Sequence, residues 1–283
     1  MILADGRSSV EIMEKGAYVK SLVLDGLEIL KPSEDGVQTH GGMAIMLPYA
    51  GRVRNAMYVW EGKQYLLPKN SGEHSIHGLT RELDWATEKA GENRGIFTIK
   101  LSTTNYPTEL SLKLEFEINS NSFSIHIEAE NKGSVNGPFM AGMHPYFRFK
   151  DSWAIESTQN LLRLNFESGF FPDGTITAIK PKALSSKGGL PFDNTYITNS
   201  TPVLFAGDRR IVLENNNMPY LVLYNGQFAG KGSIAAEPMS AAPDAFNNGI
   251  GIVSIPPGEK FRCSATFRLS RVPKIENTKD HIM

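Results

Sequence analysis

The strongest constraint on the fold of this chain is a strict alternation of apolar and polar residues in LSLKLEFEINSNSFSIHIEAEN at 110–131. Apolar side chains at every second position share one face, as in a half-buried β-strand. A polar turn, NSNS at 119–122, separates two such runs, so the segment predicts an antiparallel hairpin. His126 falls on the polar phase, and we expect it to face solvent.

Shorter alternating runs recur along the chain, at 10–32, 57–67, 95–104, 220–225 and 260–270. Turn signals rich in glycine and proline separate them, and no segment has a long helical period. We find no internal repeat and no linker that would divide the chain. The sequence therefore predicts an all-β fold, a large antiparallel β-sandwich that forms a single domain over residues 1–273, with a polar tail at 274–283.

The composition narrows the classes of ligand and partner. The 29 Lys and Arg residues nearly balance the 30 Asp and Glu residues, so no overall field favours a nucleic-acid or membrane partner. No apolar run approaches the ~20 residues of a membrane span, and the first residues do not resemble a secretory signal. The single Cys263 lies in a strand-like run and is expected to be buried in the core. These features predict a cytoplasmic protein with a small-molecule ligand, and they leave the oligomeric state open.

Two titratable residues interrupt apolar runs directly before a proline. His144 lies in MAGMHPYFRF at 140–149, and Glu237 lies in GSIAAEPMSAAPDAFN at 232–247. Proline disfavours helical backbone in the preceding residue, so we expect each run to be an apolar strand that ends at an extended titratable residue. Burial raises the pKa of a glutamate towards that of histidine, about 6.5. The two residues are a candidate general acid/base pair, and a structural hydrogen bond in the core is the alternative.

Two loops carry further candidates. Arg52 follows a largely apolar stretch in IMLPYAGRVRN at 45–55, and its charge needs an acceptor, either a ligand or a structural ion-pair partner. His74 and His77 lie in SGEHSIHGLTRELDW at 71–85. Their spacing suits a metal only on a helix, whereas the glycines of this segment indicate a loop, so we expect no metal site. For His77, a structural and a functional role both remain open.

The motifs GRV with YVWEGKQYLL, HGL, HPYF, FDNTYI, AAEPMSAAPDAFNNG and IPPGEKF resemble the aldose 1-epimerase (galactose mutarotase) family. They occur in the order of that family and cover most of the chain. The resemblance implies a large β-sandwich with an open sugar-binding cleft. It also implies interconversion of the α and β anomers of a hexose or related aldose, a reaction that calls for no redox cofactor and no metal.

Carried over to this sequence, the resemblance implies that His144 is the general acid and Glu237 the general base. His77 corresponds to the second active-site histidine, near the ring oxygen of the sugar. Arg52 and Asp193 correspond to residues that bind sugar hydroxyls. In the implied reaction the base takes the proton of the C1 hydroxyl, and the acid delivers a proton to the ring oxygen.

Three positions depart from the family pattern. Gly51 stands where an asparagine is usual, Leu79 where a second glycine is usual, and Pro238 where Thr or Ser is common. The chain is also shorter than the galactose-type enzymes. These differences leave the identity of the sugar open.

Two alternative functions remain. A hexose-phosphate 1-epimerase would need cationic contacts to phosphate, for which Arg54, Arg81 and Arg148 are candidates if they are not solvated surface charges. A non-catalytic sugar-binding protein on the same fold is the other alternative. An aromatic side chain could stack on the sugar or belong to the core, and the candidates are Trp60, Trp85 and Tyr146.

Overall fold

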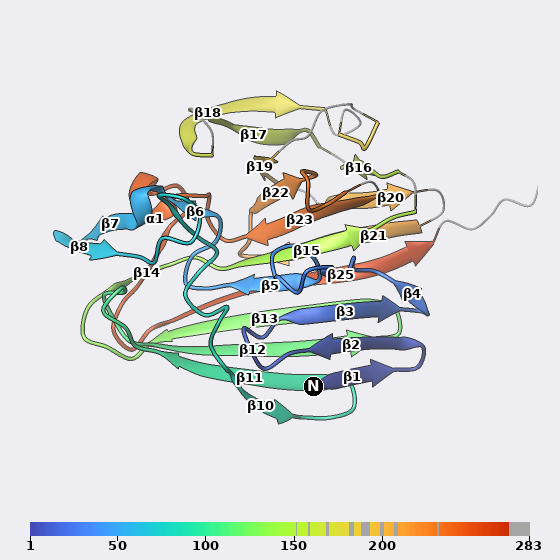
Figure 1. Ribbon diagram of the computed structural model, residues 1–283, viewed down its shortest axis with the longest axis horizontal. Helices are drawn as coiled ribbons and strands as arrows, with labels where there is room; N and C mark the ends of the chain where they lie inside the picture. Colours follow the sequence, from blue (N-terminus) through green and yellow to red (C-terminus); the bar gives the residue numbers. More distant parts are fainter. Residues whose placement is uncertain are drawn as a thin grey trace, which may run out of the picture.

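A computed structural model describes residues 1–150, 152–157, 159–167, 170–180, 184–187, 193–198, 201–206, 209–230 and 232–271. Two large antiparallel sheets dominate this part of the chain (Figure 1). This architecture confirms the all-β fold that the alternating runs predict. The tail expected at 274–283 lies outside the described residues, and the single domain over 1–273 stays a prediction.

The first sheet has eleven strands, in the spatial order β1 (Ile2–Asp5), β2 (Ser8–Ile12), β3 (Val19–Leu24), β5 (Met43–Met46), β15 (Gly142–Arg148), β23 (Ser233–Met239), β22 (Tyr220–Tyr224), β19 (Asp193–Ile197), β17 (Leu161–Phe166) and β18 (Pro172–Ile179), with β4 (Leu27–Glu28) beside β3. The second sheet has eight strands, in the order β10 (Ala86–Lys89), β11 (Arg94–Leu101), β12 (Leu110–Asn119), β13 (Ser122–Asn131), β25 (Lys260–Arg271), β21 (Arg209–Asn216), β20 (Val203–Ala206) and β16 (Ala154–Glu156).

Short elements complete the described structure. Three two-stranded ladders pair β6 (Arg52–Val53) with β9 (Ser75–Ile76), β7 (Met57–Trp60) with β8 (Lys63–Leu66), and β14 (Gly137–Phe139) with β24 (Val253–Ile255). The helical segments in the described part of the chain are the 3-10 turn η1 (Arg54–Ala56) and the helix α1 (Ala245–Asn248). No helix among these residues is long and apolar enough to cross a lipid bilayer.

The hairpin predicted at 110–131 is confirmed. β12 and β13 pair antiparallel over their whole length, and the turn between them consists of Ser120 and Asn121. The apolar positions of both strands are buried, whereas His126 on the polar phase is exposed. The sequence pattern therefore identifies which face of this hairpin packs against the rest of the molecule.

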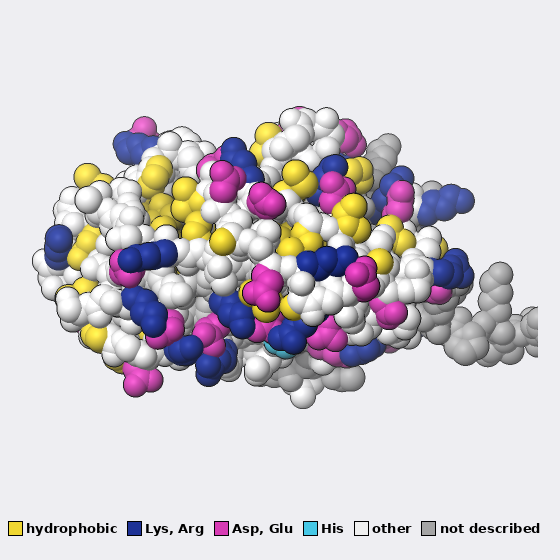
Figure 2. Space-filling view, turned by 90° about the horizontal axis from the view of Figure 1, so that it is seen from below, with side chains coloured by type: hydrophobic (Ala, Val, Ile, Leu, Met, Phe, Trp, Pro, Cys, Tyr) yellow, Lys and Arg dark blue, Asp and Glu magenta, His cyan; other side chains and the backbone are white. Residues whose placement is uncertain are grey.

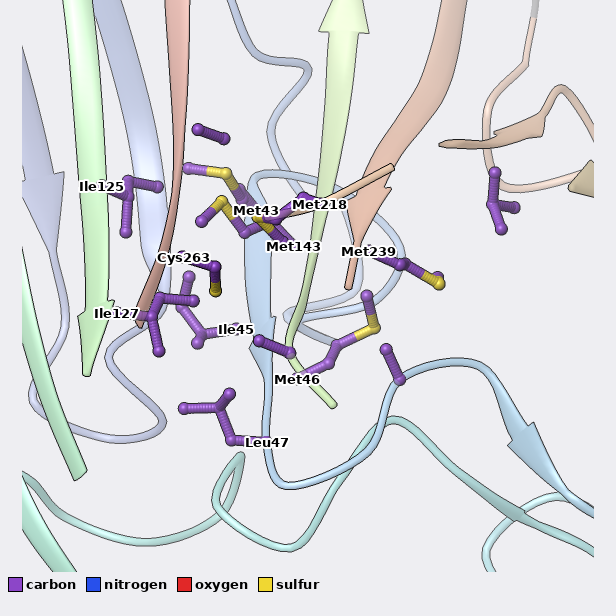
Figure 3. Close-up of a cluster of buried hydrophobic side chains, with 14 of the residues drawn as sticks. Met43, Ile45, Met46, Leu47, Ile125, Ile127, Met143, Met218, Met239 and Cys263 are labelled. Atoms are coloured by element: carbon purple, nitrogen blue, oxygen red, sulfur yellow. The ribbon is translucent and has the colours of Figure 1, made fainter. Parts of the chain in front are cut away.

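The hydrophobic core lies between the two large sheets. Phe147 of β15 packs edge-to-face on Phe267 of β25, with ring centroids 5.3 Å apart. Figure 3 shows Met143 lying near Cys263, a residue contributed by the other sheet. Cys263 is only 2% exposed, which confirms that it belongs to the core. Burying a large apolar side chain such as Phe147 stabilises the fold by about 1.5–3 kcal/mol.

The alternation within β15 gives the eleven-stranded sheet a second face, which points away from the core. Met143 and Phe147 point into the core, so the residues between them at every second position point to the opposite side of the sheet. We call this side the outer face, and it carries His144 and Tyr146. Any candidate chemistry on β15 therefore lies on the outer face.

Charged side chains of both signs are mixed on the surface shown in Figure 2. Lys and Arg lie beside Asp and Glu there. Ion pairs such as Arg94–Glu115 also join neighbouring strands. This distribution agrees with the net charge of -1 and produces no patch of one sign in that view.

Candidate active site

His144 and Glu237 lie on neighbouring strands of the eleven-stranded sheet. β15 and β23 pair antiparallel, and the register on either side of the two residues places them directly across from each other. The expectation that each strand ends at its titratable residue is wrong, because β15 continues to Arg148 and β23 to Met239. Both strands continue because each also pairs with a second neighbouring strand, β15 with β5 and β23 with β22.

The two side chains form a close, deeply buried pair. His144 Nε2 lies 3.3 Å from Glu237 Oε1, and the two residues are 5% and 2% exposed. Burial is the main reason that the pKa of His144 is lowered to about 3, and the positive charge of Arg81 acts in the same direction. Burial also raises the pKa of Glu237 well above its usual value, and the negative charge of Asp193 adds to the rise. Both shifts favour neutral side chains near neutral pH.

The sheet continues beside this pair with shorter side chains. Val222 of β22 lies opposite Glu237, and Thr195 of β19 lies opposite Val222. On the other side, Ala44 of β5 lies opposite His144. The acid and the base candidates therefore stand between smaller residues, which leaves space above the sheet for a ligand.

The two candidate loops meet beside the pair. β6 pairs with β9, which brings Arg52 opposite Ile76, and the His77 N–H donates to the Gly51 carbonyl over 3.0 Å. The His77 ring lies edge-on to the His144 ring, with centroids 5.2 Å apart. Burial lowers the pKa of His77 well below its usual value, and the neighbouring His144, Arg81 and Arg52 act in the same direction.

The backbone around His77 is strained. His77 has φ 63°, in the left-handed region that residues with a side chain rarely adopt. Gly78 follows with φ 82°, and a Cβ at that position would lie 2.4 Å from the Leu47 carbonyl oxygen. Only glycine fits so close to the Leu47 backbone.

Arg52 and Asp193 line the same space. The Arg52 guanidinium donates to Ser71 Oγ and stacks over the Phe170 ring at 4.0 Å from the centroid. Asp193 is the first residue of β19, and loss of hydration raises the pKa of its carboxyl, while the charge of Arg52 opposes the rise. Arg52 has no carboxylate within ion-pair distance among the described residues, which leaves its charge available to a ligand.

One cavity of about 260 Å³ joins these groups. All five residues expected at the site line it: Arg52, His77, His144, Asp193 and Glu237. The structure also places residues there that the sequence analysis missed, and these include Thr39, His40, Phe170, Thr195, Tyr224 and Phe228. His40 stands in the loop sequence THGG, where no apolar run sets it apart, so the sequence offered no signal comparable to HPYF.

Other candidates from the sequence lie elsewhere. Of the three aromatic candidates, only Tyr146 lines the cavity, because Trp85 is buried in the core and Trp60 donates its Nε1–H to the Asn136 carbonyl. Arg54 forms ion pairs with Glu167 and Asp244. Arg54 is thus already neutralised by two acids.

The remaining cationic and metal candidates are also separate from the cavity lining. Arg148 is paired with Glu28, and Arg81 is not a lining residue. His74 accepts a hydrogen bond from the Asn55 N–H over 3.1 Å instead of facing His77. In the part of the chain that the structure describes, no three His, Cys, Asp or Glu side chains gather as a metal site.

Comparisons with known proteins agree with this architecture. The family model described as aldose 1-epimerase matches residues 1–268. The uncharacterized protein YihR of Escherichia coli K12 is 25% identical to this chain, over 92% of this chain and 90% of its own length.

Solved structures show the same fold. A galactose mutarotase-like protein from Clostridium acetobutylicum has a TM-score of 0.83 at 17% identity and covers 96% of this chain and 95% of its own. A galactose 1-epimerase from Lactobacillus acidophilus has a TM-score of 0.74 at 20% identity and covers 95% of this chain and 93% of its own. At these identities the likeness establishes the fold.

Proposed function

Because the chain belongs to the aldose 1-epimerase family, we propose that it interconverts the α and β anomers of an aldose, with His144 and Glu237 as its proton-transferring pair. The observation that carries this proposal is the buried contact between these two side chains at the cavity, 3.3 Å apart. Anomer exchange needs an acid and a base on the same sugar ring at the same time, and this pair supplies both.

The first step is opening of the ring. Glu237, as a carboxylate, takes the proton of the C1 hydroxyl, and His144, as an imidazolium, delivers a proton to the ring oxygen. The C1–ring oxygen bond breaks, and its electron pair stays on the ring oxygen while C1 becomes an aldehyde. Rotation about the C1–C2 bond then presents the other face of the aldehyde, and the ring closes with the two side chains in exchanged roles.

The two side chains hold one proton between them throughout this cycle. Before opening, the proton is on His144; after opening, it is on Glu237 and His144 is neutral. The pKa shifts of the pair favour the second of these states, protonated Glu237 beside neutral His144. Burial therefore stabilises the form that the pair takes while the open-chain aldehyde is present.

The residues around the pair orient the sugar. Arg52 and Asp193, which line the cavity, would bind sugar hydroxyls, and His77, beside His144, would contact the ring oxygen. Tyr146 stacks on the His144 ring, with centroids 4.8 Å apart and planes 23° apart. This contact limits rotation of the His144 ring and so helps to keep its Nε2 beside Glu237 Oε1.

The test is the rate of anomer exchange, measured by NMR for free hexoses and pentoses and corrected for the spontaneous reaction. His144→Asn and Glu237→Gln should each lower kcat by about 10²–10⁴-fold, because each removes one proton-transferring group. The double variant should lose far less than the product of the single losses, because both groups act on one transition state.

His126→Asn is the matched control, since His126 is an exposed histidine on the other sheet. It should leave exchange unchanged. A folded His144→Asn protein that turns over within about threefold of the parent, against the loss expected for a general acid, would contradict the proposed role. Absence of exchange in the parent for every sugar would instead favour a sugar-binding protein on this fold.

A further inference from the structure

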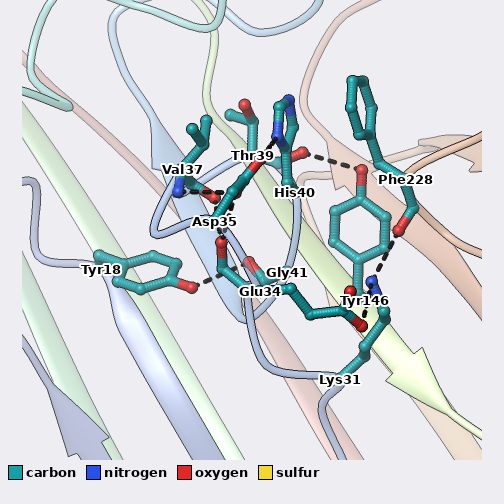
Figure 4. Close-up of polar contacts among 11 residues, drawn as sticks. Tyr18, Lys31, Glu34, Asp35, Val37, Thr39, His40, Gly41, Tyr146 and Phe228 are labelled. Atoms are coloured by element: carbon teal, nitrogen blue, oxygen red, sulfur yellow. Dashed lines mark hydrogen bonds and ion pairs between the residues drawn. The ribbon is translucent and has the colours of Figure 1, made fainter.

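The loop between β4 and β5 carries a hydrogen-bonded Asp–His pair (Figure 4), and His40 of this pair lines the cavity. Asp35 Oδ2 lies 2.7 Å from His40 Nδ1, and Asp35 Oδ1 accepts the Val37 N–H over 3.0 Å. The His40 backbone N–H donates to the Val37 carbonyl over 3.0 Å. The loop therefore fixes both the carboxylate and the imidazole that it holds.

The carboxylate determines which ring nitrogen of neutral His40 carries the proton. The hydrogen bond from His40 is the main reason that the pKa of Asp35 is lowered to about 2, so Asp35 is ionised and only accepts. Nδ1 must then donate, which leaves Nε2 as a hydrogen-bond acceptor. In Figure 4 this second nitrogen points away from Asp35.

A second contact holds the plane of the His40 ring. The ring stacks on Phe228 with centroids 3.6 Å apart and planes 10° apart. The Phe228 carbonyl in turn accepts a hydrogen bond from Lys31 Nζ over 2.9 Å. His40 is 23% exposed in its side chain and lines the same cavity as the proposed acid and base.

The loop is also joined to the proton-transferring pair. The Tyr146 hydroxyl donates to the Thr39 carbonyl over 2.8 Å, and the same tyrosine stacks on His144. His40 thus holds a defined position relative to His144 through its neighbour Thr39 and through Tyr146. Because His40 and His144 line the same cavity, a ligand bound there can contact both rings.

We propose that His40 is a substrate-binding residue whose Nε2 accepts a hydrogen bond from one sugar hydroxyl, and that Asp35 is the positioning residue that fixes its tautomer. This inference rests on the proposed function and extends it to a contact with His40 that selects sugars by the hydroxyl they place there. A sugar analogue that lacks this hydroxyl would leave the partly buried His40 Nε2 without a hydrogen-bond partner, which disfavours binding of the analogue.

The experiment compares His40→Phe with the parent, because phenylalanine keeps a flat ring against Phe228 and removes both nitrogens. KM for the best-exchanged free sugar should rise by about tenfold, with kcat within about twofold, since one hydrogen bond to a hydroxyl is lost. For one monodeoxy analogue of that sugar, the parent and the variant should have equal KM values, because that analogue lacks the hydroxyl that His40 binds.

Asp35→Asn tests the positioning role. It should raise KM in the parent background by less than His40→Phe does, and it should have no further effect in the His40→Phe background, because Asp35 acts through His40. If His40→Phe does not fold by thermal melting, His40→Leu is compared in the same way. His126→Phe serves as the control for loss of a histidine elsewhere.

An unchanged KM in the folded His40→Phe protein would overturn the inference. A rise in KM of equal size for every deoxy analogue would also overturn it, because the effect would then be one of packing. If the parent exchanges no anomers, the proposed function fails, and calorimetric Kd values for the same sugars decide on His40: weaker binding in the variant supports the contact, and equal or undetectable binding overturns it.

Discussion

Replacement of Glu237 by glutamine should greatly lower activity but make the folded protein increasingly stable relative to the parent as pH rises. The pKa of Glu237 is raised in the folded protein above its unfolded value of 4.5, so the folded state holds a proton that the unfolded state releases above that pH. The parent therefore loses stability as pH rises from about 4.5 towards the folded pKa, at up to about 1.4 kcal/mol per pH unit. The amide of the Glu237→Gln variant does not titrate, so the variant escapes this loss.

Above about pH 4.5, the stability of the variant relative to the parent should thus increase with pH, by up to about 1.4 kcal/mol per pH unit. For a chain of this size, each 1 kcal/mol corresponds to a relative gain of about 2–4 °C in Tm. Urea unfolding and thermal melts of both proteins at several pH values measure the difference. Activity should be lost over the same range.

Glu115→Gln is the control with the opposite sign. Hydrogen bonds from Lys113 and Arg94 lower the pKa of Glu115, so its stabilising contribution is present above the unfolded pKa and is lost as pH falls. The stability of the Glu115→Gln variant should therefore fall further below that of the parent as pH rises. If Glu237→Gln shows the same direction as Glu115→Gln, the pKa of Glu237 is not raised in the folded protein, which refutes protonated Glu237 beside neutral His144 as the favoured state of the pair.

Three further outcomes follow from the site. Arg52→Ala should raise KM by about tenfold with little change in Tm, since its guanidinium faces the cavity; parallel losses of binding and Tm would indicate a structural role instead. Anomer exchange should survive exhaustive chelation, and a loss restored by a divalent ion would contradict the metal-free mechanism. Gly78→Ala should cost more than about 2 kcal/mol in urea unfolding, because its Cβ would meet the Leu47 carbonyl at 2.4 Å in a left-handed backbone; a cost under about 0.5 kcal/mol would contradict this reasoning.

The local pattern of the sequence determined the strands and their faces. The alternation at 110–131 predicted the β12–β13 hairpin and the exposed side of His126, because a shift of one residue would exchange the buried and solvent faces. The same reasoning predicted that Cys263 is buried. An apolar run interrupted before a proline was also enough to single out His144 and Glu237 as unusual.

Only the tertiary structure decided which of these residues meet. His144 and Glu237 are far apart in the chain, and their 3.3 Å contact depends on the pairing of β15 with β23, which no local pattern encodes. The loop residue His40 is held at the cavity by contacts with Asp35 and Phe228. No alternation of apolar and polar residues marks these partners in the sequence. Periodicity reports the environment of a side chain along its own strand, whereas contact between distant segments depends on how the whole chain packs.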